Sequence, residues 1–116
     1  GSQAQGGVVM TVNILGTKYS IYYKSPSEDK FLRECDGYCD KSSKKIVVTT
    51  ENLELDNFAD YQKKCLRHEI IHAFMFESGL AENWEHKNFG QEETVVDWVA
   101  IQFPKLLEIF KKVGAL

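Results

Sequence analysis

The 116-residue sequence lacks the features that would assign it to several specialised classes of protein. It has no apolar run approaching the roughly 20 residues that a membrane-spanning helix requires, so we expect no membrane partner. Its net charge is only -3 and its acidic and basic residues are interspersed, so it offers no basic patch to a nucleic acid. Residues 10–116 contain no repeat, low-complexity tract or linker. Membrane, nucleic-acid-binding and repeat proteins are therefore not expected.

Cysteine is also scarce, with Cys35, Cys39 and Cys65 the only three. An odd number without a secretory signal is typical of a reducing compartment rather than of a disulfide framework, so we expect a cytoplasmic protein. Cys35 and Cys39 are four residues apart and could pair or bind a metal. Gly37 between them interrupts helical geometry, which favours two reduced thiols.

What the chain does contain is the composition of a folded protein: 43% hydrophobic and 12% aromatic residues. Its length suits one domain with a single modest core, which we expect to be a monomer covering residues 10–116. Residues 1–9 begin with Gly-Ser and are small, polar and glycine-rich, so we interpret them as an expression-tag remnant or a disordered tail.

Two β-hairpins are predicted in the first half. Apolar residues alternate over residues 12–14 and 19–23, with Gly16-Thr17 between the two runs. A second pair, residues 37–39 and 44–50, flanks a polar turn and is rich in β-branched residues in its second strand. One face of each hairpin should be buried.

Three helices are predicted. Ser25, Pro26 and Glu28 form a capping box with proline at the first helical position, which predicts a short helix ending before Gly37. Apolar residues and histidines then recur at three- and four-residue steps from Asp56 or Asn57 to about Ser78.

Sequence signals also mark both ends of the long helix and the extent of the last one. Asn57 with Asp60 is a weak capping pair, and Gly79 suits the position after the helix. Residues 80–91 are polar and read as a loop, and a last helix should run from about Glu92 to Val113, where Pro104 kinks it or starts a new helix. Strands followed by helices indicate an α+β fold.

The long helix carries His68-Glu69-Ile70-Ile71-His72, the spacing of many zinc metallopeptidases. Residues four apart lie one turn apart on one face of a helix, so His68 and His72 can bind the same ion. Glu69 lies on nearly the same face and can act as a general base toward a water at the metal. The alternative is an ordinary helix with two histidines and a glutamate.

A catalytic zinc ion commonly has three protein ligands, so the chain should supply one more. Glu77 lies five residues after His72 and points away from the pair. We predict Glu93 as the third ligand, on the inward side of the last helix, with Asp97 bonding a ligand histidine. Glu92 is the alternative ligand. This inward side is inferred from the neighbouring apolar residues Val96, Ala100 and Ile101.

The remaining residues of interest have plainer interpretations beside functional ones. Cys65 lies one turn before His68 and could approach the metal, although a small buried hydrophobe is expected. The Tyr38 hydroxyl could stabilise an oxyanion or anchor substrate, or simply pack. Glu82, Glu85 and His86 lie in the loop, where a metal ligand is possible but poorly preorganised, and His86 is expected to be a surface histidine rather than a ligand or a transition-state stabiliser. The aromatic residues expected to pack in the core and loops are Phe74, Phe76, Trp84, Trp98, Phe103 and Phe110.

The segments "LRHEIIHAF" and "EETVVDWVAIQFPKLL" resemble the small phage- and prophage-associated zinc metallopeptidases of Firmicutes. "VNILGTKYSIYYK" and "CDGYCDKSSKKIVV" are similar to the amino-terminal half of the same group, so the resemblance covers residues 10–116. More distantly, the metal motif and last helix resemble the ImmA/IrrE family of gluzincin-type proteins.

The resemblance implies a minimal zincin-like fold, a small twisted sheet packed on the helix that carries the metal motif. It implies His68, His72 and Glu93 as zinc ligands and Glu69 as general base. ImmA/IrrE members typically have Glu-x-x-Ala-Asn at the last helix, whereas this chain has Val95-Val96-Asp97. The resemblance also implies that residues 44–50 or 37–39 form a sheet edge that binds an extended peptide.

These observations predict a zinc metallopeptidase that cleaves a protein or peptide, by family analogy a phage-related regulatory protein such as a repressor. The alternative is a non-catalytic zinc-bearing module that binds a partner protein. A metal-dependent hydrolase of a non-peptide substrate is a third hypothesis, weakened by the lack of an evident phosphate-binding loop.

Overall fold

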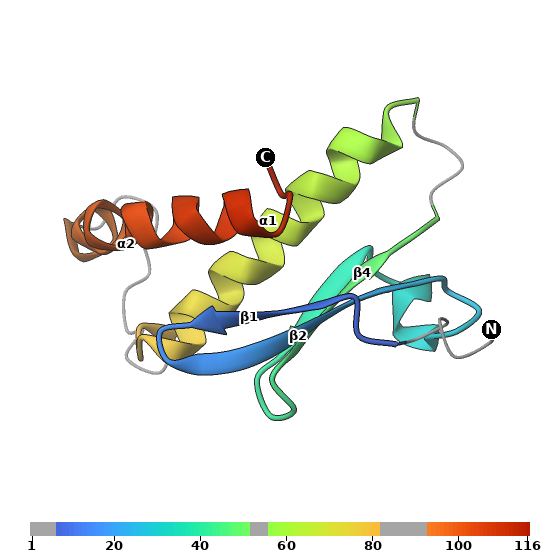
Figure 1. Ribbon diagram of the computed structural model, residues 1–116, viewed down its shortest axis with the longest axis horizontal. Helices are drawn as coiled ribbons and strands as arrows, with labels where there is room; N and C mark the ends of the chain where they lie inside the picture. The colour runs from blue at the N-terminus through green and yellow to red at the C-terminus, as the bar shows by residue number, and fades with distance from the viewer. Residues whose placement is uncertain (1–6, 52–55, 82–92) are drawn as a thin grey trace.

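The computed structural model describes residues 7–51, 56–81 and 93–116, with the backbone alone for residues 93, 94, 96, 97 and 100. Within these ranges a four-stranded sheet lies against two long helices, so the predicted α+β class is confirmed (Figure 1). No helix among these residues is long and apolar enough to span a membrane. The elements are β1 (Met10–Ile14), β2 (Thr17–Lys24), the 3-10 helix η2 (Lys30–Arg33), β3 (Gly37–Asp40), β4 (Lys45–Thr49), α1 (Phe58–Glu77) and α2 (Glu93–Lys112).

The sheet has the order β1-β2-β4-β3 and is mixed. Both predicted hairpins are confirmed, since β1 pairs antiparallel with β2 and β3 pairs antiparallel with β4, while β2 and β4 run parallel. The first turn uses Leu15 and Gly16, both with positive φ, and Thr17 belongs to β2 rather than to the turn. Among the described residues β3 is therefore an edge strand and β4 an interior one.

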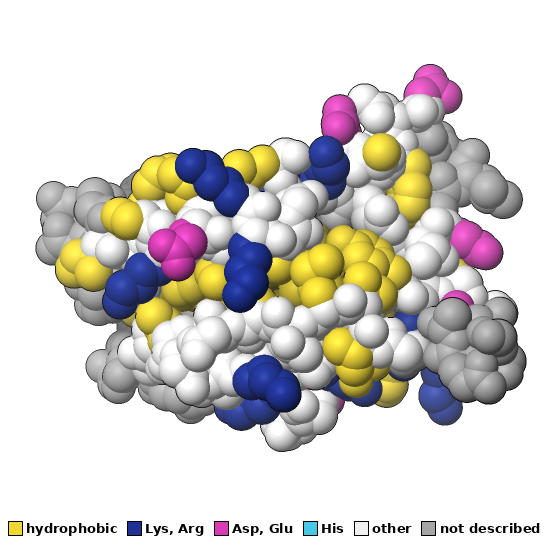
Figure 2. All heavy atoms as spheres, viewed as in Figure 1, with side chains coloured by type: hydrophobic (Ala, Val, Ile, Leu, Met, Phe, Trp, Pro, Cys, Tyr) yellow, Lys and Arg dark blue, Asp and Glu magenta, His cyan; other side chains and the backbone are white. Residues whose placement is uncertain are grey.

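The core lies between one face of the sheet and the two long helices. α1 crosses this face diagonally, and the second half of α2 lies on the same side of the sheet (Figure 1). In the view of Figure 2, apolar side chains form a band between the helices and the sheet, with Lys and Arg side chains around it. The largest contributors are the sheet residues Val12, Ile14, Tyr19, Ile21, Ile46 and Val48, the α1 residues Leu66, Ile70 and Phe74, and the α2 residues Leu106, Ile109 and Phe110.

The prediction of a short helix after Ser25 is wrong in two respects, because the helix that forms is a 3-10 helix and it begins only at Lys30. Ser25 and Glu28 do contact each other, since the Ser25 backbone N–H and hydroxyl both donate to the Glu28 carboxylate at 2.9 and 3.0 Å. These bonds close a turn, after which Asp29 takes an extended conformation that stops the helix. Asp29 then caps one 3-10 turn, η2, whose Leu32 is buried.

The two long helices lie close to their predicted bounds. Ser78 caps α1 and Gly79 follows with a φ of 85°, as the C-terminal signal predicted. Asn57 donates its side-chain amide to Asp60 rather than capping a backbone N–H. α2 is one helix that continues through Pro104, so the prediction of a new helix starting there is wrong.

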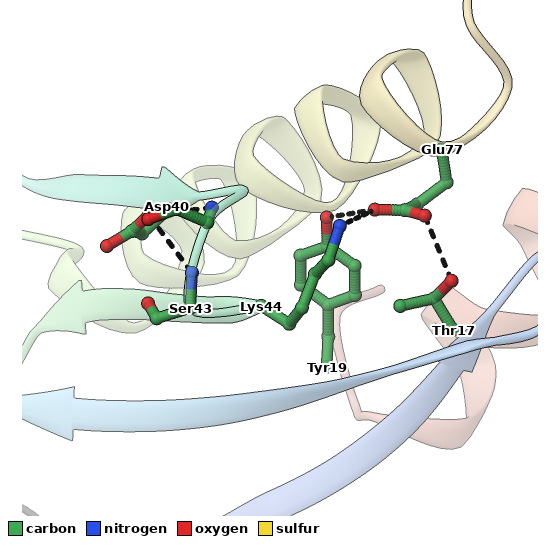
Figure 3. A network of polar contacts seen from close by, with 7 residues as sticks. Thr17, Tyr19, Asp40, Ser43, Lys44 and Glu77 are labelled. Carbon is green, nitrogen blue, oxygen red and sulfur yellow. Dashed lines mark hydrogen bonds and ion pairs between the residues drawn. The ribbon is translucent and has the colours of Figure 1, made fainter.

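The far end of α1 is held to the sheet by a network of polar contacts around Glu77. The Glu77 carboxylate accepts hydrogen bonds from Thr17 at 2.9 Å, from Tyr19 at 2.7 Å and from Lys44 at 2.8 Å (Figure 3). Beside it, Asp40 accepts hydrogen bonds from the backbone of the turn between β3 and β4 (Figure 3). Glu77 thus joins the last turn of α1 to β2 and to the second hairpin.

Replacing Glu77 by Gln is expected to lower the free energy of unfolding by about 1–3 kcal/mol, because a charged acceptor is lost and donors from Tyr19 and Lys44 are left poorly paired. Urea unfolding at neutral pH measures this loss. The exposed Glu51, changed to Gln, is the matched control and should unfold as the unaltered protein does. Equal stability of the two variants would mean that the network contributes nothing.

The same network predicts a pH dependence. The hydrogen bond from Lys44, followed by that from Tyr19, lowers the pKa of Glu77 below its ordinary value of 4.5. Because the pKa is lower in the folded state, the stabilisation is complete above pH 4.5 and is lost as the pH falls through the folded pKa. Between about pH 6 and about pH 3, the Glu77→Gln variant should therefore lose less stability than the unaltered protein.

Candidate functional site

A stripe of functional side chains runs along one face of α1. Tyr61, Cys65, His68 and His72 follow one another at steps of four, three and four residues. The Nε2 atoms of His68 and His72 lie 3.1 Å apart, with ring centroids 4.8 Å apart. No histidine is visible on the face shown in Figure 2, so the pair lies away from that face.

The histidine pair fits a zinc ion. Two nitrogens at about 2.0–2.1 Å from a tetrahedral ion lie roughly 3.3–3.4 Å apart, close to the observed separation. Both imidazoles are exposed, so an ion can reach them. The His72 ring is nevertheless partly desolvated by the residues around it, and this, followed by the proximity of His68, lowers the pKa of His72 and favours the neutral form that binds metals. The pair can therefore supply two adjacent ligands.

Glu69 is buried beside this pair, with 8% of its surface exposed. Burial alone raises the pKa of its carboxyl to about 7, with no compensating hydrogen bond or charge from the described residues. A carboxyl group that lines a cavity and whose pKa is raised by burial is a candidate functional group. α1 turns Glu69 toward β3, where Gly37 lies against the carboxylate.

The side chains of Glu69 and His68 line a cavity of about 230 Å³. Tyr61 and Asp36 form its far wall, where the Tyr61 hydroxyl donates a hydrogen bond to the Asp36 carboxylate. Tyr61 was not singled out from the sequence, although its spacing of seven residues from His68 signals a shared helix face. Asp36 could not be found, because only the docking of β3 against α1 brings it there. The cavity is lined by Asp36, Gly37, Tyr61, Lys64, Cys65, His68 and Glu69.

Glycine at position 37 allows β3 to lie close to the backbone of β4 beside Glu69. A Cβ at this position would lie 3.1 Å from the carbonyl oxygen of Val47 and 3.5 Å from Glu69 Oε2. The backbone of β4 cannot move aside easily, because β4 lies inside the sheet. A side chain here must therefore push β3 away from the Val47 carbonyl oxygen, while its Cβ would make only an ordinary contact with Glu69.

The variant Gly37→Val is expected to lose about 1–3 kcal/mol of stability through overpacking. Thermal unfolding measures the loss, and Cys39→Val is the matched control because position 39 lies on the same face of the same strand. Equal stability of the two variants would show that position 37 has room for a side chain beside the Val47 carbonyl oxygen.

The third ligand stays a prediction. The side chains of Glu93 and Asp97 lie outside the described residues, as do Glu82, Glu85, His86 and Glu92. Among the side chains that are described, no group of three or more His, Cys, Asp or Glu is placed to hold a metal. Glu77 is engaged with Thr17, Tyr19 and Lys44, which agrees with the prediction that it points away.

The predicted inward face of α2 is wrong at two apolar residues. Ile101, taken as an apolar residue on the inward side, is 67% exposed, and Phe103, expected to pack, is 51% exposed. The inward face of α2 is marked instead by Leu106, Ile109 and Phe110. Trp98 does pack against the core, and its indole N–H donates to the Ser78 hydroxyl at 3.0 Å, which ties α2 to the end of α1.

Tyr38 and the three cysteines lie at different distances from the histidine pair. The Tyr38 hydroxyl donates to Asp29, and its ring makes an edge contact with Phe31, so it lies outside the cavity of Glu69. Cys35, Cys39 and Cys65 are all free thiols. Cys65 is half-buried and lines the cavity.

Residues 44–50 and residues 37–39 are the two alternatives for the predicted peptide-binding edge, and the strand order shows which of them is an edge strand. β4 lies between β2 and β3, so residues 44–50 do not form an edge. β3 is an edge among the described residues, and its first residue, Gly37, touches the Glu69 side chain.

No protein-family model, curated protein or solved structure matches this chain. The function is therefore argued from the geometry of the site.

Proposed function

We propose that this protein is a zinc-dependent hydrolase of peptide bonds with a zincin-like fold. One observation carries the proposal. The Nε2 atoms of His68 and His72 converge to 3.1 Å, and His68 lines one cavity with Glu69, a largely buried residue whose carboxyl pKa is raised to about 7. Two converging imidazoles beside such a carboxyl are the groups that a hydrolytic metal site uses.

The ligands proposed for zinc are His68 and His72, with Glu93 as the third and Asp97 bonding a ligand histidine. When bound, zinc polarises a carbonyl as a Lewis acid and makes water more acidic. A purely structural zinc site would more often be closed by cysteines, and the cysteine nearest to the pair on α1, Cys65, is a half-buried thiol.

Glu69 is proposed as the general base and then the general acid. Its carboxylate takes a proton from the attacking water as the water oxygen bonds to the peptide carbonyl carbon. Glu69 then passes this proton to the amine nitrogen as the C–N bond breaks, so a carboxylic acid and an amine leave. Gly37 keeps the space beside the carboxylate open for these transfers.

An extended peptide is the substrate that the sheet favours. β3 pairs with β4 along one side, and no strand among the described residues pairs with its other side. A peptide can add to such an edge through main-chain hydrogen bonds. Because β3 begins at Gly37, against Glu69, a strand added there would bring a peptide bond to the site. The resemblance to phage-associated metallopeptidases extends the proposal to a regulatory protein such as a repressor as the substrate.

A peptide library tests the proposal. The zinc-reconstituted protein is incubated with a peptide mixture obtained by digesting a whole cell extract, and new termini are identified by mass spectrometry. We expect cleavage that a chelator abolishes and zinc restores. Zinc binding without any cleavage of peptides or unfolded proteins would instead favour the zinc-bearing interaction module.

A further inference from the structure

A second and larger hollow lies along β3, beyond the histidine pair. Its volume is about 680 Å³, against about 230 Å³ for the cavity of Glu69, and this size is typical of ligand sites. Its apolar wall consists of Phe31 from η2, Tyr38 and Cys39 from β3, and Phe76 from α1. We call this hollow the apolar groove.

The apolar groove adjoins the candidate metal site. The ring of Phe76 stacks on that of His72, with centroids 6.2 Å apart and planes 21° apart. Gly37, at the start of β3, lies next to Glu69, and Asp40, at its end, lines the apolar groove. The strand therefore runs from the candidate metal site to the groove. A peptide that pairs with the edge of β3 away from β4 would lie beside both the candidate metal site and the apolar groove.

The lining of the groove is selective for apolar groups. Phe31 is 64% exposed, which is unusual for a residue of its size, and its ring faces that of Tyr38. The charged lining residues are Glu34, Asp40 and Lys41, which together carry one net negative charge and so disfavour an acidic side chain. The Lys41 ammonium lies 5.3 Å from the centre of the Phe76 ring. The smaller cavity, by contrast, is lined by polar residues including Asp36, Tyr61 and Lys64.

We propose that the apolar groove is the specificity subsite of the peptidase and binds a large apolar side chain on the N-terminal side of the scissile bond. This inference rests on the proposed function. The direction follows from strand pairing, because antiparallel pairs are the more stable. A peptide antiparallel to β3 runs from the Asp40 end toward Gly37, so the residues before the scissile bond reach the groove.

The experiment compares peptides that differ at the three positions before the scissile bond. We expect kcat/KM to be at least about tenfold higher with Phe or Leu at one of these positions than with Ser or Asp. The variants Phe31→Ser and Phe76→Ser should bring this ratio close to one, because each removes part of the apolar wall. Phe103→Ser, which removes a similarly exposed phenylalanine on α2, is the matched control and should keep the preference.

Binding is measured separately on the Glu69→Gln variant, by fluorescence anisotropy of labelled Phe and Ser peptides. Cleavage without an apolar preference, a preference on the C-terminal side, or a preference unchanged by Phe31→Ser and Phe76→Ser would overturn the subsite and leave the peptidase standing. Tighter binding of the Phe peptide without cleavage by the unaltered protein would overturn the peptidase and leave the groove as a peptide-binding site.

Discussion

Replacing Glu69 by Gln is expected to reduce peptide hydrolysis by about 10²–10⁴-fold, the usual contribution of a general base. Glutamine preserves the shape of the side chain beside Gly37 but cannot accept a proton from water. Zinc content should be unchanged, since Glu69 is not among the proposed ligands. The zinc-free variant should be at least as stable as the unaltered protein, because an unpaired buried charge is removed.

Two comparisons make this result interpretable. Glu108→Gln changes an exposed glutamate on α2 and should leave both hydrolysis and zinc content unaltered. Full activity in the Glu69→Gln variant would show that Glu69 is not the base, whatever the metal does. Loss of zinc together with activity would mean that Glu69 is itself a ligand or holds one in place.

The second large effect is expected from His72→Ala, which removes one of the two converging nitrogens. We expect zinc affinity to fall by more than about 100-fold, the upper end of the effect of losing an outer-shell partner, and hydrolysis to fall with it. His72 is exposed, so the fold should survive the substitution. Competition with a chromophoric chelator measures the affinity, and circular dichroism checks the fold.

His68→Ala should behave in the same way, because the Nε2 atoms of His68 and His72 are proposed to bind the same zinc ion. His86→Ala, which removes the remaining histidine of the chain, is the control and should keep its zinc. A loss of zinc in His86→Ala that equals the loss in His72→Ala would place the metal elsewhere.

The parts of the fold that follow from local patterns were predictable. The period-two alternation around Val12 and Ile21 marked β1 and β2, and the helical spacing around His68 marked α1. Gly79 marked the end of α1 because its left-handed φ suits the residue after a helix. The pairing of β2 with β4 was not predictable, since a parallel pair depends on which hairpin sides meet over the core.

Local signals also failed where tertiary contacts decided the outcome. At Ser25 only one bond of the capping box forms, from the Ser25 backbone N–H to the Glu28 carboxylate, and no α-helix starts because Asp29 takes an extended conformation before η2. Pro104 lies inside α2, since the packing of Leu106 and Ile109 on the core holds the helix together despite the missing N–H. Ile101 showed that an apolar residue on a helix need not face inward.

The candidate site divides in the same way. His68, Glu69 and His72 could be predicted, because their relation is set by one helix. Gly37 and Asp36 could not be assigned to the site, because their place beside Glu69 depends on how β3 docks against α1. The apolar groove was equally hidden, as it joins three elements that are distant in sequence.

The central claim is that His68 and His72 hold one zinc ion. Elemental analysis of the purified protein after reconstitution with zinc and removal of the excess tests it most directly. The account predicts about one equivalent of zinc per chain, as a single two-histidine site with a carboxylate ligand requires. The double variant His68→Ala, His72→Ala should retain none. Absence of zinc in the unaltered protein, or equal zinc in the double variant, would contradict the account.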